Sequence, residues 1–319
     1  MPPCGVLQVP VLAMTTLDLQ QARPRRLVSQ RLLPYLLSLP ALIVCIGILV
    51  PFFTAVGYSL QRYNLSMPYA RAWTWWQNYV DLFTDGAFWH TIRVSLTYAV
   101  LTVGVELVLG LAIAMLLVRR TLVNNVMSVL LILPLMTAPA IAALMWKLMT
   151  NPNFGVLSYL VSAVGFTDFR WASAPSSALF TVVLVDVWVY TPFMIILLLA
   201  GLRALPRQPF EAAELDGVPM SFVFFRITLP MLTPYIVTAA LFRMLDAIQQ
   251  FDIIFAMTQG GPGDTLMVFQ VLAYLEAFTF TSIGRSAAML MVLWAITYAL
   301  SNIFIKHWLR LRERAHGQA

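Results

Sequence analysis

The chain has 319 residues, of which 60% are hydrophobic and 11% are charged, and its mean hydropathy is +0.81. Ordinary soluble domains carry about 25% charged residues, so this composition excludes a soluble fold and predicts an integral membrane protein. The net charge of +6 does not require a nucleic-acid partner, because it follows the positive-inside pattern of membrane proteins.

Six runs are apolar and long enough to cross a membrane, because a spanning helix needs about 20 mostly apolar residues. Backbone amides in lipid must find hydrogen-bond partners within their own segment, so the runs are predicted to be α-helices. The runs lie between Arg31 and Arg62, between Arg93 and Arg119, between Arg120 and Lys147, between Arg170 and Arg203, from about Met231 to Met257, and from Ser286 to Ile305.

The distribution of lysine and arginine predicts which loops face the cytoplasm. With the N-terminus inside, the cytoplasmic segments are richer in these residues than the longer outside loops, so both termini are predicted to be cytoplasmic. The domain prediction is a tail at 1–31, one six-helix domain at 32–305 with a cytoplasmic loop at about 203–230, and a second tail at 306–319.

The two cysteines, Cys4 and Cys45, fall in the first tail and the first span, which is not the pattern of an extracellular disulfide framework. The apolar stretch up to Leu17 precedes the arginines, which is the wrong order for a signal peptide. Met14 is an alternative start.

The predicted outside loop from Gln61 to Ile92 is rich in aromatic residues. An interfacial aromatic belt with a short surface helix is the favoured interpretation, and a docking surface for an external partner is the alternative. The aromatic residues are Trp73, Trp75, Trp76, Tyr79, Phe83, Phe88 and Trp89.

Prolines interrupt two predicted spans: Pro134 and Pro139 the third, and Pro192 the fourth. Proline removes a backbone donor and bends a helix, which membrane helices tolerate when neighbours satisfy the freed groups.

Polar residues follow helical spacing in two predicted spans. Ionisable groups at membrane depth are costly and usually face a bundle interior or a wet cavity. A structural clasp and a site for a hydroxyl-rich solute are both open interpretations, and Arg243 and Asp246 can pair within their own helix. The two faces are Asp186, Val189, Tyr190 and Phe193 in the fourth span, and Arg243, Asp246, Ala247 and Gln250 in the fifth.

Two further acids in the predicted spans have other interpretations. Glu106 stands alone in the second span and is expected to make a structural contact rather than bind solute. Asp252 lies nearer the outer end of its predicted helix, where it is expected to extend toward water.

A polar segment interrupts the apolar sequence between the fourth and fifth spans. Pro206 and Pro209 are expected to end the incoming helix, and residues 211–215 to form a short helix with acids in its first turn. Gly217 suits a left-handed closing position. Ser221 is expected to cap a second short helix that runs to Pro230.

The spacing in this segment resembles a known family. Glu211-Ala212-Ala213, three residues, Gly217, nine residues and then Ile-x-Leu-Pro resembles the coupling-loop signature of the permease subunits of bacterial ABC importers. Residues 258–262, Thr-Gln-Gly-Gly-Pro, resemble a segment of carbohydrate-importer permeases, in particular the first of the two maltose-type or glycerol-phosphate-type permeases. The resemblance covers about Leu32 to Ile305.

The resemblance implies an all-α type I permease in the bacterial cytoplasmic membrane. It implies partners: a second permease, two ATP-binding subunits that hold ATP and Mg, and an external solute-binding protein. The coupling residues by motif match are Glu211, Ala212, Ala213, Asp216 and Gly217. The sugar-contact positions that it implies coincide with the two polar faces named above.

The predicted function is therefore half of the translocation pathway of an ATP-driven importer for a sugar or sugar-like solute. The chain has no phosphate-binding G-x-x-x-x-G-K-[ST] loop, so no enzymatic activity, catalytic residue, metal or cofactor of its own is predicted. The alternatives are an ion-coupled transporter with Asp186 and Asp246 as a relay, and a scaffold without transport.

Overall fold

The computed structural model describes residues 33–166 and 169–316. The predicted tail at 1–31, with Cys4 and Met14, lies outside these residues. The chain divides into two compact units, residues 1–52 and 53–319. The described part of the first unit is the beginning of helix α1 (Leu33–Ser59), and the architecture below concerns the second unit.

The described chain is mostly helical. Five helices, one of them the continuous stretch Met220–Ile248, are long and apolar enough to span a membrane, and a bent pair makes a sixth span if counted as one. This confirms the predicted all-α membrane class. The long helices are α1, α3 (Gly86–Leu117), α7 (Pro175–Ala204), α10 (Leu229–Ile248) and α13 (Ile283–His316).

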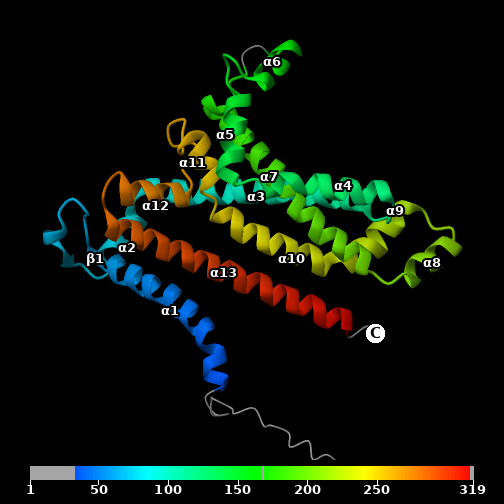
Figure 1. The fold of residues 1–319 in the computed structure, drawn as a ribbon, viewed down its shortest axis with the longest axis horizontal. Helices are drawn as coiled ribbons and strands as arrows, with labels where there is room; N and C mark the ends of the chain where they lie inside the picture. The colour runs from blue at the N-terminus through cyan, green and yellow to red at the C-terminus, as the bar shows by residue number, and fades with distance from the viewer. Residues whose placement is uncertain (1–32, 167–168, 317–319) are drawn as a thin grey trace, which may run out of the picture. The chain divides into compact units, whose positions relative to one another are not determined.

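Shorter elements connect the long helices (Figure 1). They are β1 (Gln61–Arg62), η1 (Pro68–Ala70), β2 (Ala72–Trp73), α2 (Gln77–Thr84), α4 (Leu122–Ile132), η2 (Leu133–Met136), α5 (Pro139–Met149), α6 (Val156–Ala163), η3 (Trp171–Ser173), α8 (Gln208–Leu215), α9 (Met220–Phe222), the π-helical η4 (Val223–Thr228), α11 (Asp252–Thr258) and α12 (Phe269–Phe278).

The third predicted span is not one straight helix. It is broken into α4 and α5, which meet at an angle of 92°. Pro139 opens α5 at a position where its missing N–H costs nothing. Pro134 lies in the 3-10 turn η2 between the two helices. The bend is therefore placed by the two prolines that the sequence marks.

The fifth predicted span also differs from expectation. The chain is helical from Met220 through Ile248, so Ser221 lies inside a helix and caps nothing, and the helix continues through Pro230. The wider π turn η4 precedes this proline, and the Thr228 hydroxyl bonds the carbonyl of Val223 five residues back. At its other end the predicted span stops at Ile248, and α11 is a separate helix.

The packed core of the second unit lies where α3, α7 and α10 contact one another (Figure 1). A methyl group on Gly110 would lie 2.6 Å from Cβ of Met194, so only glycine allows α3 and α7 to come this close. A methyl group on Gly201 would lie 2.6 Å from Cγ of Tyr235 in α10. These two glycines let three helices share one core.

The segment that follows α1 forms a small hairpin and the surface helix α2, which confirms the predicted short helix. The register pairs Gln61 with Trp73. Asp85 caps α3 by accepting from the amide of Ala87 at 2.9 Å, and it pairs with Arg285 of α13. The hairpin therefore leads into a fixed start for α3.

Candidate functional site

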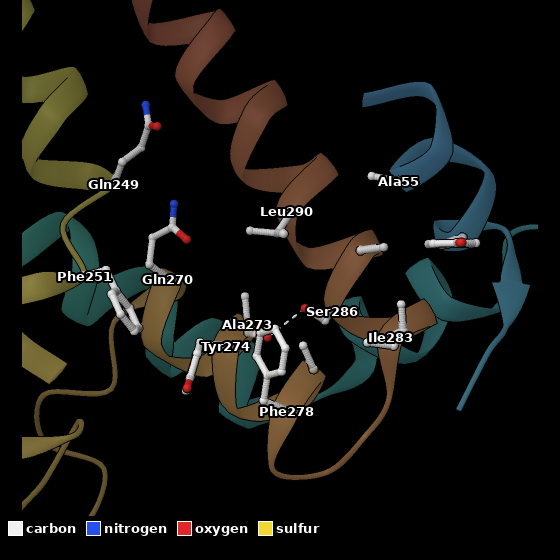
Figure 2. Close-up of a pocket in the computed structure, with 13 residues that line it drawn as sticks. Ala55, Gln249, Phe251, Gln270, Ala273, Tyr274, Phe278, Ile283, Ser286 and Leu290 are labelled. Atoms are coloured by element: carbon white, nitrogen blue, oxygen red, sulfur yellow. Dashed lines mark hydrogen bonds between the residues drawn. The ribbon is translucent and has the colours of Figure 1, made fainter. Parts of the chain in front are cut away.

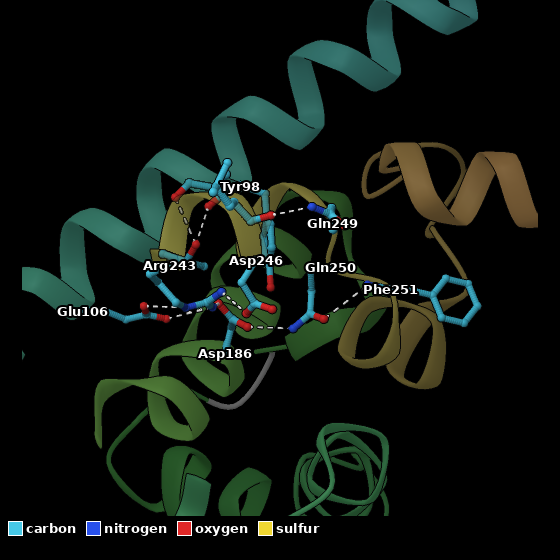
Figure 3. A network of polar contacts seen from close by, with 11 residues as sticks. Tyr98, Glu106, Asp186, Arg243, Asp246, Gln249, Gln250 and Phe251 are labelled. Carbon is cyan, nitrogen blue, oxygen red and sulfur yellow. Dashed lines mark hydrogen bonds and ion pairs between the residues drawn. The ribbon is translucent and has the colours of Figure 1, made fainter. Parts of the chain in front are cut away.

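A buried network of charged side chains links α3, α7 and α10 (Figure 3). Its centre is Arg243 of α10, whose side chain is only 1% exposed. A buried cation is stable only when it is paired and its donors are satisfied. Arg243 contacts three carboxylates and one aromatic ring, so its charge is enclosed by more partners than the Asp246 that the sequence pairs with it.

Glu106 of α3 makes the most extensive contact with this guanidinium. Arg243 donates from Nε to Oε2 at 2.8 Å and from Nη2 to Oε1 at 3.0 Å. Two parallel hydrogen bonds between a guanidinium and a carboxylate are stronger and more directional than a single one. The pair joins α3 to α10 across 137 positions of sequence.

Asp186 of α7 is the second partner and is fully buried. One carboxylate oxygen accepts from Nη2 of Arg243, and the other accepts from Nε2 of Gln250 at 3.0 Å. Gln250 in turn accepts from the backbone amide of Phe251 at 3.2 Å. The network thus fixes the turn between α10 and α11 as well as the helices.

Asp246 is the part of the network that reaches solvent. It accepts from Nη1 of Arg243 at 2.8 Å, as the spacing of three residues predicts, and its side chain is 55% exposed. The Arg243 guanidinium also lies 4.0 Å from the ring centre of Tyr190, which is half-buried. Asp246 and Tyr190 are therefore the network members that a solute can touch.

The structure brings together five of the eight predicted solute-contact residues: Asp186, Tyr190, Arg243, Asp246 and Gln250. Val189 and Ala247 are buried in the apolar packing beside them, and Phe193 is half-buried on the same helix as Asp186. The expectation that Glu106 makes a structural contact is confirmed, because its carboxylate accepts two hydrogen bonds from Arg243 in the buried network. The signal for this role in the sequence is that Glu106 is the single charged residue of an otherwise apolar span.

A cavity of about 480 Å³ adjoins this region at Gln249, the residue after the last turn of α10 (Figure 2). Its aromatic and amide side chains come from α12, the turn after α10 and Tyr58, and α13 adds aliphatic side chains and Ser286. Phe251 and Tyr274 have ring centres 5.1 Å apart, and Tyr274 and Phe278 are 4.9 Å apart. The amides in the lining are Gln249 and Gln270.

The predicted coupling loop forms a helix and a tight turn. Glu211 lies in the first turn of α8, where the helix dipole favours an acid. Gly217 has φ of +65°, as its predicted closing role requires. Pro209 lies in the first turn of α8, after α7 has ended at Ala204, which corrects the expectation that it ends the incoming helix.

The surface of this loop is unusually apolar at its tip. Leu215 is 90% exposed and Met220 is 81% exposed. Among the predicted coupling residues, Ala213 is buried, and Glu211, Ala212, Asp216 and Gly217 are exposed. Exposed apolar side chains rimmed by polar ones are typical of a protein contact.

The Thr258–Pro262 segment folds into a compact loop after α11. Gln259 and Gly260 have positive φ, the peptide before Pro262 is cis, and the amide of Leu266 bonds the carbonyl of Gly260 at 3.1 Å. Asp252 begins α11 instead of ending a long helix, and it is exposed. Within residues 33–166 and 169–316, no cluster of His, Cys, Asp and Glu is arranged to hold a metal.

Comparison with known proteins shows the family to which the chain belongs. The profile of the family described as "Binding-protein-dependent transport system inner membrane component" matches residues 106–315. The trehalose/maltose transport system permease protein MalF of Thermococcus litoralis is 32% identical over 86% of this chain and 92% of its own length. The sulfoquinovosyl glycerol transport system permease protein SmoG of Agrobacterium fabrum is 30% identical over 87% and 91%.

A solved structure has the same fold. A crystal structure of a bacterial ABC transporter involved in the import of the acidic polysaccharide alginate matches with a TM-score of 0.75 and 19% identity, covering 87% of this chain and 95% of the other. The chain belongs to the family of binding-protein-dependent transport system inner membrane components. It is an ABC importer permease and not itself an enzyme, because ATP hydrolysis in such importers lies in partner subunits.

Proposed function

We propose that this permease imports a sugar or sugar-like solute, such as a di- or oligosaccharide, a polyol or a sugar ester. The observation that carries the proposal is the network of Glu106, Asp186, Arg243 and Asp246 within apolar helices. Ionisable groups are costly there and mark solute pathways. The relatives named for trehalose, maltose and sulfoquinovosyl glycerol support the solute class.

The solute path runs along the faces of α7 and α10. Tyr190, Phe193 and Asp246 are the accessible members and touch the solute directly, by aromatic contact and by hydrogen bonds to hydroxyl groups. Asp186, Arg243 and Gln250 are buried and hold these side chains in place. Val189 and Ala247 shape the wall behind them.

The α8 loop couples this path to ATP hydrolysis. Glu211, Ala212, Ala213, Asp216 and Gly217 form the element that enters a cleft on an ATP-binding subunit, with Leu215 at its exposed tip. The loop joins α7 to the continuous helix of α9, η4 and α10, so a push on it reaches both faces of the solute path. This continuity supports the coupling role.

The complete importer contains a second permease, two ATP-binding subunits that hold ATP and Mg, and an external solute-binding protein. The α8 loop and both termini face the cytoplasm of a bacterial cell. The network does not support the ion-coupled alternative. Asp186 and Asp246, which were predicted to relay the ion, both form ion pairs with Arg243.

Uptake by proteoliposomes that contain the assembled importer tests the proposal. Uptake of labelled sugar is expected to require ATP hydrolysis, and Gly217→Arg is expected to abolish uptake while the protein stays folded in the membrane. The matched control is Gly263→Arg, because Gly263 also has a positive φ, +62°, and open space around it, and lies in the loop between α11 and α12. Unimpaired uptake by Gly217→Arg contradicts the coupling role, and ATP-independent uptake contradicts the proposed function.

A further inference from the structure

The charge of the network is unbalanced. Arg243 is the single cation among three carboxylates, those of Glu106, Asp186 and Asp246. Its guanidinium is 1% exposed and already donates to all three. An incoming solute therefore cannot reach the positive charge. The charged group that it meets is the exposed carboxylate of Asp246.

The helices that build the network offer no second cation near it. The other arginines on α3 and α7 are Arg93 and Arg203. Arg93 lies about 20 Å along α3 from Glu106, and Arg203 about 26 Å along α7 from Asp186, at the helical rise of about 1.5 Å per residue. Neither can neutralise an anionic group held beside Asp246.

The adjoining cavity also lacks a positive charge that could hold an anionic solute. Its lining contains no charged residue, and its polar groups are the amides of Gln249 and Gln270 and hydroxyls such as those of Tyr274 and Ser286 (Figure 2). Aromatic faces carry a negative electrostatic potential, which favours sugar C–H faces and cations over anions. Gln249 connects the cavity to the network, because it lies three residues from Asp246 on the same helical end.

We propose that the cavity at Gln249 and the side chain of Asp246 form one binding station for an uncharged or cationic sugar, and that anionic sugars are excluded. The carboxylate of Asp246 accepts hydrogen bonds from hydroxyl or amino groups, and the amides of Gln249 and Gln270 bond further hydroxyls. The aromatic side chains receive the apolar face of the sugar ring. This inference rests on the proposed function and narrows its solute class.

The electrostatic potential at this proposed binding site can be measured with charged thiol reagents, without knowing the solute. In the assembled importer, with Cys4 and Cys45 replaced by serine, Gln249→Cys presents a thiol at the exposed junction of network and cavity. Two methanethiosulfonate reagents of similar size are compared, one with a trimethylammonium group and one with a sulfonate, and each rate is normalised to a free thiol. The cationic reagent is expected to react at least about tenfold faster, because Asp246 is a near neighbour.

A matched pair of variants tests whether Asp246 causes the difference between the rates of the cationic and anionic reagents. Asp246→Asn is expected to lower the ratio by at least about threefold. Glu214→Gln removes an equal charge from an exposed residue of α8, outside the network and the cavity, and is expected to leave the ratio unchanged. The proposal is overturned if the two reagents react at equal normalised rates, or if Asp246→Asn leaves the ratio of the two rates unchanged.

The solute class is then tested by ATP-driven uptake with trehalose, glucosamine and sn-glycerol 3-phosphate. Uptake of trehalose or glucosamine without sn-glycerol 3-phosphate supports the proposal, and uptake of sn-glycerol 3-phosphate overturns it. Failure of all three solutes overturns the solute assignment together with the proposed function. The reagent ratio separates the two failures, because it depends on the charge of the station and not on transport.

Discussion

The guanidinium of Arg243 and the carboxylate of Glu106 form two hydrogen bonds, at 2.8 and 3.0 Å, inside the apolar contact between α10 and α3. Both side chains are almost completely shielded from solvent. Removing one partner of a buried ion pair leaves the other charge without compensation, which is the costly half of such an arrangement.

Glu106→Ala is therefore expected to destabilise the folded permease by about 3–5 kcal/mol. Glu106→Gln keeps one acceptor for Arg243 and is expected to lose less. Thermal unfolding of the purified protein in detergent measures both. Glu214→Ala, at an exposed position of α8, is the control and should stay within about 0.5 kcal/mol of the parent. Equal unfolding temperatures for Glu106→Ala and the control would show that the ion pair of Glu106 and Arg243 does not stabilise the fold.

Gly110→Ala is expected to destabilise the contact between α3 and α7. The added methyl group would lie 2.6 Å from Cβ of Met194, and overpacking of this kind costs about 1–3 kcal/mol. Gly104→Ala, on the same helix with no atom within 4 Å of the new methyl group, is the control and should be neutral or slightly stabilising. Thermal unfolding distinguishes them, and identical behaviour refutes the close approach.

Glu276 of α12 makes stability depend on pH. Burial raises the pKa of Glu276 above its ordinary value of 4.5, although the nearby Arg285 lowers it, and Asp85 raises it further. The folded state then binds the proton more tightly than the unfolded chain. The stabilising contribution is complete below pH 4.5 and is lost as the pH rises through the raised pKa.

Glu276→Gln removes this titration. The unfolding temperature of the variant relative to the parent is expected to increase as the pH rises from about 4 toward 7. Glu214→Gln, an exposed acid, provides the control and should follow the parent at every pH. Parallel curves for Glu276→Gln and the parent would show that the carboxyl group is not perturbed by folding.

Gly217→Ala is expected to cost about 1–2 kcal/mol locally, because φ of +65° is unfavourable for a residue with Cβ. Gly217→Asn should cost less, since asparagine tolerates the left-handed region. Sugar-stimulated ATP hydrolysis by the assembled importer should fall in the order glycine, asparagine, alanine. An unchanged rate in the alanine variant would mean that the turn geometry is not needed for coupling.

The sequence predicted the helices well where composition alone decides them. Long apolar runs must be helical in lipid, and the polar faces of α7 and α10 follow from helical spacing. The motif at Glu211 also predicted the short helix and the left-handed turn at Gly217. These features depend on residues close together in the chain.

Features that depend on distant residues were not predictable in the same way. Pro134 and Pro139 mark a break, but the angle of 92° depends on what α4 and α5 pack against. Ser221 has the side chain of a helix cap, yet the helix already includes it, because the helix begins at Met220 after Pro219. The pairing of Glu106 with Arg243 joins two charges that no local pattern connects.

A cross-linking measurement tests the central claim most directly, that the α8 loop of this permease contacts an ATP-binding subunit. Leu215→Cys in the cysteine-free background, labelled with a photoreactive maleimide, presents the probe at a position that is 90% exposed. Tyr69→Cys in the β1–β2 hairpin, 86% exposed, is the control. The account predicts a cross-link from position 215 to the ATP-binding subunit and none from position 69. An intact complex in which position 215 fails to cross-link to that subunit would contradict it.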